Sequence, residues 1–102
     1  MNSTDKPKSA PGLAAIRALA ERLKLVSDLT RLRVLLLLAG DELSVGSLSK
    51  ATGCSMTALS RHLAFLRLAG LIEARRQSQS QIYSLTAQGR DIGRLVAVLV
   101  DP

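Results

Sequence analysis

Residues 43–72 read LSVGSLSKATGCSMTALSRHLAFLRLAGLI, and this stretch decides the fold. Ser44 and Ser55 are residue types that cap helix N-termini. Gly53 and Gly70 favour helix ends, so a short helix and a longer one over residues 56–69 are expected. The apolar residues of these helices recur every three or four positions: Val45, Leu48 and Ala51, then Leu59, Leu63 and Leu66. Two helices joined by a short glycine-containing turn are typical of a helix-turn-helix.

The segments on either side of residues 43–72 also have spacings typical of helices and strands. Downstream, residues 71–76 and 82–85 are expected to be strands joined by the polar residues 77–81, which makes a hairpin. Upstream, residues 13–26 and 29–39 have helical spacing, and the second of these helices is apolar enough to be buried, with Asp28 as its cap and Gly40 as a left-handed stop. A last helix is expected after Thr86, a residue type that can cap a helix N-terminus. The fold class is therefore mainly α with a β-hairpin: a winged helix-turn-helix of four helices, a hairpin and a fifth helix.

Length and composition limit the function classes. The 102 residues fit one domain, expected as a disordered tail at residues 1–12 and a winged-helix DNA-binding and dimerisation domain at 13–102. The net charge of +6 favours a polyanionic partner, while one Tyr, one Phe and no Trp argue against single-strand stacking platforms. The chain shows no signal peptide or long apolar run, and its one cysteine fits a reducing compartment, so a cytoplasmic protein without membrane contact is expected.

The positive charge gathers where a winged helix meets DNA. Residues 50–83 carry five basic side chains and a single acidic one, Glu73. We expect Thr57, Ser60 and Arg61 to contact base edges of duplex DNA, and Met56 to touch a thymine methyl group. The recognition-helix residues assigned to DNA are Ser55, Met56, Thr57, Ser60, Arg61 and His62. Those of the wing are Arg75, Arg76, Gln77, Ser78 and Gln79.

Apolar stripes on the first and last helices predict a homodimer, because such stripes would otherwise face water. The residues assigned to dimerisation are Leu13, Ile16, Leu19, Leu23, Ile92, Leu95, Val96 and Leu99. A two-fold dimer would place its recognition helices in major grooves about 34 Å apart, on an inverted repeat. Gly89 and Gly93 share one face of the last helix, where they permit close backbone approach or merely weaken the helix start.

Two residues have competing interpretations. Cys54 is a small apolar plug in the turn or, as the alternative, a redox-active thiol. His62 is a phosphate contact, a hydrogen-bonded boundary residue or a metal ligand, although one His and one Cys do not fill a zinc sphere. We therefore expect no metal and no cofactor. The sequence shows no recognisable paired carboxylates, nucleophile with a base or phosphate-binding glycine loop, so no catalytic residue is assigned and no enzyme is expected.

Four motifs together resemble the ArsR/SmtB family: TRLRVLLLL at 30–38, ELSVGSLS at 42–49, LSRHLAFLRLAGLI at 59–72 and IYSL at 82–85. The resemblance implies a cytoplasmic homodimeric winged-helix transcriptional repressor, with the first and last helices forming the dimer and residues 56–62 reading DNA. Metal-sensing members carry a cysteine pair in the stretch matching 43–49, or histidine and acidic ligands on the last helix. Residues 43–49 contain no cysteine, and the last helix offers only Asp91 and Asp101. The chain therefore resembles the HlyU- and NolR-like branch that lacks metal ligands.

A second function remains open. Met56, Ala64 and Leu68 would place apolar groups on the side of the longer helix that faces DNA. Such a surface also suits a winged helix that binds another protein, an anti-activator with little affinity for DNA.

Overall fold

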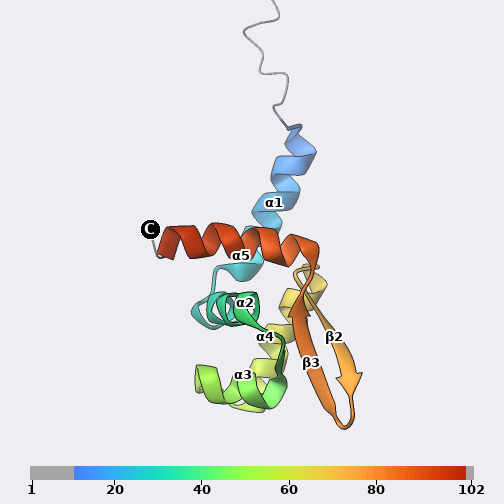
Figure 1. The fold of residues 1–102 in the computed structure, drawn as a ribbon. Helices are drawn as coiled ribbons and strands as arrows, with labels where there is room; N and C mark the ends of the chain where they lie inside the picture. The colour runs from blue at the N-terminus through green and yellow to red at the C-terminus, as the bar shows by residue number, and fades with distance from the viewer. Residues whose placement is uncertain (1–10, 101–102) are drawn as a thin grey trace, which may run out of the picture.

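The structure is a computed structural model that describes residues 11–100. The central helix is Leu29–Gly40, and the other helices and one β-hairpin lie around it (Figure 1). The elements in chain order are α1 (Leu13–Val26), α2 (Leu29–Gly40), β1 (Leu43–Ser44), α3 (Val45–Thr52), α4 (Met56–Leu68), β2 (Ile72–Gln77), β3 (Ser80–Leu85) and α5 (Ala87–Val100). The expected order of four helices, a hairpin and a fifth helix is confirmed, and none of the helices within 11–100 is long and apolar enough to cross a membrane.

The expected helix caps are present. The side chains of Asp28, Ser44 and Ser55 each accept a hydrogen bond from the backbone N–H three residues later, at 3.0, 3.1 and 3.1 Å. Gly53 and Gly70 adopt the left-handed conformation after α3 and α4, with φ of 74° and 75°. These features explain why the helix-turn-helix could be located so closely from the residue types alone.

Two local expectations are wrong. Gly40 is the last residue of α2 and is absent from the left-handed residues; the chain instead leaves the helix through Asp41, which is extended with φ −167°. That extended exit leads into β1, a third strand that pairs with β3 through Leu43 and Tyr83. The sheet order is β1-β3-β2, and the expected five-residue connection between the hairpin strands shortens to Ser78 and Gln79. A two-residue strand is too short to show the alternation that sequence patterns detect.

The core lies around α2, as its apolar composition predicts. Val34 and Leu35 of this helix are fully buried, and α2 contacts α3, α4, α5 and β3. The buried apolar residues are Val26, Val34, Leu35, Leu38, Leu48, Leu59, Leu63, Leu66, Leu71, Ile72, Leu85 and Ile92. In Figure 1, α5 lies across one side of this core and α1 extends away from it, whereas the β2–β3 hairpin projects beside α3 and α4.

The start of α5 is fixed against the end of α4. The Thr86 hydroxyl donates to the carbonyl of Gly70 at 2.6 Å and accepts from the backbone N–H of Gly89 at 3.1 Å, which confirms the expected cap. A Cβ atom at Gly89 would lie 1.9 Å from the carbonyl oxygen of Leu71. Gly89 therefore permits close backbone approach, and that approach is to the same chain.

Candidate nucleic-acid interface

The recognition helix α4 has one face locked in the core and one face open to solvent. Leu59, Leu63 and Leu66 are at most 1% exposed, as their spacing predicts. The exposed side carries Met56, Thr57, Ser60, Arg61 and Ala64. The Ser60 hydroxyl donates to the carbonyl of Met56 at 2.8 Å, so its oxygen is left as an acceptor toward solvent. Five of the six residues assigned to DNA on this segment, Ser55 included, are thus exposed together.

The turn before α4 is held from several directions. Ser49 donates to the carbonyl of Cys54 at 2.6 Å, and the Thr52 hydroxyl accepts from the Cys54 N–H at 3.3 Å. From α2, the Arg33 guanidinium donates to the carbonyls of Ala51 and Thr52 at 2.8 and 3.0 Å. Arg33 therefore satisfies the carbonyl end of α3 and ties it to the central helix. These four hydrogen bonds hold the turn from which the recognition helix begins.

Cys54 occupies this turn as a half-buried residue packed against the core. Its Sγ atom lies 3.7 Å from the hydroxyl of Thr30 on α2. These contacts support the interpretation of Cys54 as a packing residue, and the redox alternative rests on the sequence alone. Within residues 11–100, no three His, Cys, Asp or Glu side chains gather in a way that could hold a metal ion.

His62, the sixth residue assigned to DNA on this segment, points toward α2. Its Nδ1 atom accepts a hydrogen bond from Nε of Arg31 at 3.1 Å and lies 3.6 Å from Oδ2 of Asp28. Its side chain is 23% exposed. The structure thus favours the hydrogen-bonded boundary interpretation, which sequence spacing could not separate from a phosphate contact. Sequence reasoning gave no role to Arg31, the partner that decides this placement.

From its position on α2, the Arg31 side chain contacts residues of both α1 and α4. Its guanidinium donates to the carbonyl of Leu25 at the end of α1 at 2.8 Å and lies 4.2 Å from the ring centroid of Phe65 on α4. The backbone N–H of Arg31 donates to the Asp28 carboxylate and is the main reason that the pKa of Asp28 lies below its usual value, against a smaller opposing effect of burial. We call Leu25, Asp28, Arg31, His62 and Phe65 the Arg31 cluster.

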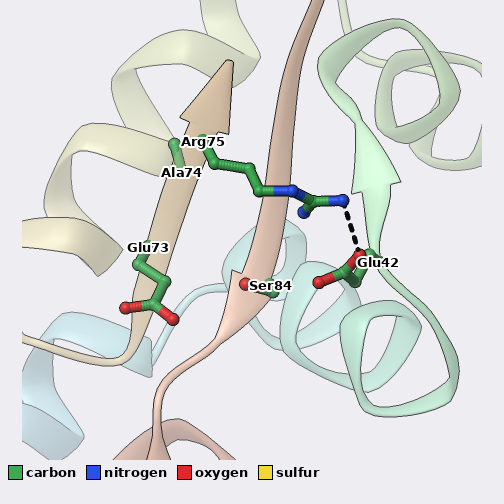
Figure 2. Close-up of a pocket in the computed structure, with 5 residues that line it drawn as sticks. All are labelled: Glu42, Glu73, Ala74, Arg75 and Ser84. Atoms are coloured by element: carbon green, nitrogen blue, oxygen red, sulfur yellow. Dashed lines mark ion pairs between the residues drawn. The ribbon is translucent and has the colours of Figure 1, made fainter. Parts of the chain in front are cut away.

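The wing consists of residues 72–85, and its two arginines lie on opposite faces of β2. Arg75 reaches across β3 to Glu42, with Nη2 3.0 Å from the carboxylate oxygen and also 3.0 Å from the Gln77 side-chain oxygen (Figure 2). Together with Glu73, Ala74 and Ser84, this pair lines a shallow hollow of about 350 Å³ on the outer side of the sheet.

Arg76 follows on the other face of β2, paired in register with Gln81. It is exposed, and no ion pair holds it in the part of the chain that the structure describes. Gln77, Ser78 and Gln79 are exposed at the hairpin tip. The wing residues assigned to DNA therefore share one end of the hairpin, but Arg75 already has an anionic partner.

The stripe assigned to dimerisation is exposed on both helices, with two exceptions. On α1 the exposed fractions are 67% for Leu13, 49% for Ile16, 46% for Leu19 and 39% for Leu23. On α5, Leu95 is 52% and Leu99 73% exposed, and Val98, which sequence analysis left out, is 65% exposed.

Ile92 and Val96 are the exceptions. Ile92 is only 8% exposed, and Val96 packs against the core of the same chain. The expectation of an open stripe is wrong for these two residues, because they lie on the side of α5 that packs onto the core.

Comparisons with known proteins agree with this arrangement. Residues 28–74 match the family model described as bacterial regulatory protein, arsR family. The chain is 43% identical over 65 residues to transcriptional activator HlyU of Vibrio cholerae, covering 64% of this chain and 60% of that protein. It is 37% identical over 92 residues to the transcriptional regulator YgaV of Escherichia coli, covering 85% of this chain and 91% of that protein. The match spans only 33% of another relative, Rv0324 of Mycobacterium tuberculosis.

Solved structures give the same result. HlyU from Vibrio cholerae superposes with a TM-score of 0.81 at 34% identity, covering 86% of this chain and 97% of that one. The homodimeric winged helix-turn-helix DNA-binding domain of Mb0332 from Mycobacterium bovis superposes with a TM-score of 0.75 at 31% identity, covering 92% and 87%. On the family match, the similarity to YgaV and the superposition on HlyU, this chain belongs to the ArsR family of winged helix-turn-helix transcriptional regulators.

Proposed function

We propose that this regulator is a homodimeric cytoplasmic repressor that binds an inverted-repeat operator in duplex DNA. One observation carries the proposal: α4 presents Thr57, Ser60 and Arg61 to solvent while three leucines fix its opposite face. Small side chains beside a guanidinium let a helix enter the major groove and present polar groups to base edges. The description of the Mycobacterium bovis relative as a homodimeric DNA-binding domain supports both parts of the proposal.

In this mechanism the two regions of the interface have different tasks. Arg61 and the neighbouring hydroxyl groups contact bases, which gives sequence preference. The free N–H groups after Ser55 and the exposed Arg76 contact phosphates, which gives affinity without sequence preference. Metal and cofactor have no part in the proposal, and the relatives named above are regulators rather than enzymes.

The dimer forms through the apolar residues that the single chain leaves in water. Leu13 on α1 and Leu99 on α5 are 67% and 73% exposed, and together with the other exposed apolar residues of these two helices they form a patch that a stable monomer would not be expected to leave uncovered. A second copy related by a two-fold axis covers both stripes, and it places the two copies of α4 about 34 Å apart.

The first experiment selects bound duplexes from a random pool and then measures their affinity against salt. We expect an inverted repeat and an affinity that falls steeply as salt rises. Arg61→Ala should weaken operator binding by about 1–3 kcal/mol and relax the preference at one base position. Arg67→Ala is the matched control, since it removes an exposed arginine from the far end of the same helix and should keep the base preference. An Arg61→Ala protein that binds like its parent would contradict the assignment.

A second function is favoured by the exposure of Leu68 and Met56 on α4, 81% and 51%. These residues would suit a protein partner, such as one recognised by an anti-activator. The salt titration separates the two functions, because an apolar protein interface does not weaken steeply with salt as phosphate contacts do. A chain that selects no duplex, at any salt concentration, would favour this second function.

A further inference from the structure

We propose that His62 is a positioning residue that holds α4 for DNA through Arg31 and does so only in its neutral form. This inference rests on the proposed function, because it concerns the same recognition helix. Arg61, the neighbouring residue, faces solvent, whereas His62 faces Arg31 and Asp28. The two adjacent residues therefore act differently: one would meet DNA, and the other sets where the helix lies.

The Arg31 cluster connects the recognition helix α4 to α1 and to the start of α2. A single guanidinium touches the last turn of α1 through the Leu25 carbonyl, and it touches the middle of α4 through both His62 and Phe65. Arg31 itself stands in the first turn of α2, whose cap is Asp28. The recognition helix is thus tied to the dimerisation helix α1 and to the start of the central helix by one side chain.

The hydrogen bond from Arg31 demands a particular protonation state. Nδ1 of His62 accepts the Nε–H of Arg31 at 3.1 Å, and a ring nitrogen accepts only while it carries no proton. This hydrogen bond requires a neutral imidazole with its proton on Nε2. A proton on Nδ1 would put two N–H groups of like charge against each other. Asp28, 3.6 Å from the same nitrogen, would then become the partner of His62, and Arg31 would lose its acceptor on α4.

Few charged groups surround the imidazole. They are Arg31 on α2 and Asp28 at the cap before α2, and on α4 the adjacent charged residue is Arg61. From α1 the cluster receives a backbone carbonyl, while Lys24 is directed to Glu21 at 3.9 Å. Asp28 stays ionised in mild acid because its pKa is lowered by the Arg31 N–H. His62 is the only histidine of the chain, and histidine is the side chain that ordinarily changes charge between pH 5 and 8.

The sign of the pH dependence separates this role from direct contact. If His62 touched a phosphate, acidification would add a positive charge at the interface and tighten binding. If His62 positions α4 through Arg31, acidification removes the competent form and weakens binding. Histidine side chains ordinarily change charge between pH 5 and 8, so this role predicts weaker binding at pH 5.5 than at pH 7.5.

The experiment measures the affinity of the full chain for its selected duplex at pH 7.5 and 5.5, with circular dichroism at both values. The parent should lose affinity at pH 5.5 relative to pH 7.5. In His62→Asn, Oδ1 replaces Nδ1 as an acceptor that does not titrate, so the ratio of the two affinities should approach one. Arg67→Ala is the control, since Arg67 is exposed at the far end of α4, and its ratio should remain that of the parent. Tighter binding of the parent in acid, or a parental ratio in His62→Asn, would overturn the proposal.

A second measurement needs neither a variant nor DNA. Because the chain has one histidine, its imidazole nitrogen signals are unambiguous in a nitrogen-15 spectrum. We expect Nδ1 to be unprotonated and Nε2 protonated at pH 7.5, and the opposite tautomer would overturn the inference. If the parent selects no duplex at either pH, the proposed function fails and takes this role with it. If the duplex binds without the expected pH dependence, only the role of His62 fails.

Discussion

Gly89 lies in α5, where the backbone of that helix packs against Leu71, a residue between α4 and β2. A methyl group there would sit 1.9 Å from the Leu71 carbonyl oxygen, and backbone cannot move aside as a flexible side chain can. Gly89→Ala should therefore destabilise the fold by about 1–3 kcal/mol, measured by denaturant unfolding. Gly93→Ala, four residues along the same helix, meets its nearest atom at 3.6 Å and should be neutral or stabilising by up to about 1 kcal/mol. Equal losses in both variants would contradict the close approach.

Single residues also show where sequence reasoning succeeds and where it stops. Ser44, Ser55 and Gly53 could be placed because their roles depend on backbone conformation within a few residues. The partners of His62 and Arg75 lie 31 and 33 positions away, at Arg31 and Glu42. Local spacing carries no information about such contacts, so both residues were expected to face DNA with their neighbours.

Among the elements, the wing offers a paired test. Among residues 11–100 no acidic side chain pairs with Arg76, whereas Arg75 must leave Glu42 before it can meet a phosphate. Arg76→Ala should lower the slope of log affinity against log salt by about one, and Arg75→Ala should lower it clearly less. The measurement is a salt titration of each variant on the selected duplex. Equal decreases would show that Arg75 exchanges Glu42 for DNA.

The helices of the fold were predictable to within a residue or two, because long periodic segments identify both the element and its buried face. The recognition helix was expected over residues 56–69 and is observed as Met56–Leu68. β1 escaped prediction because it consists of Leu43 and Ser44 alone and exists only through pairing with β3. Elements that depend on a distant strand leave little trace in their own sequence.

At the scale of the whole molecule, a charged side chain placed within the exposed apolar stripes of α1 and α5 should weaken dimerisation. Leu99→Glu should weaken the dimer by at least about 3 kcal/mol, roughly a hundredfold in Kd, because a two-fold interface contains the substituted residue twice. Sedimentation equilibrium measures this directly. Leu68→Glu is the matched control, since Leu68 is 81% exposed but lies on α4, outside the stripes. A Leu99→Glu protein that stays dimeric would place the interface elsewhere.

Because nearly the whole of α1 is exposed, the stability of this helix should depend on the concentration of the protein. Of its fourteen residues only Val26 is buried, so in the proposed dimer the helix would gain most of its stability from the second chain that covers it. Folding of this segment and association are then one equilibrium, and its midpoint depends on how much protein the cell makes. In the proposed mechanism, operator occupancy would then rise more steeply than in simple proportion to expression, which amounts to a threshold in protein concentration.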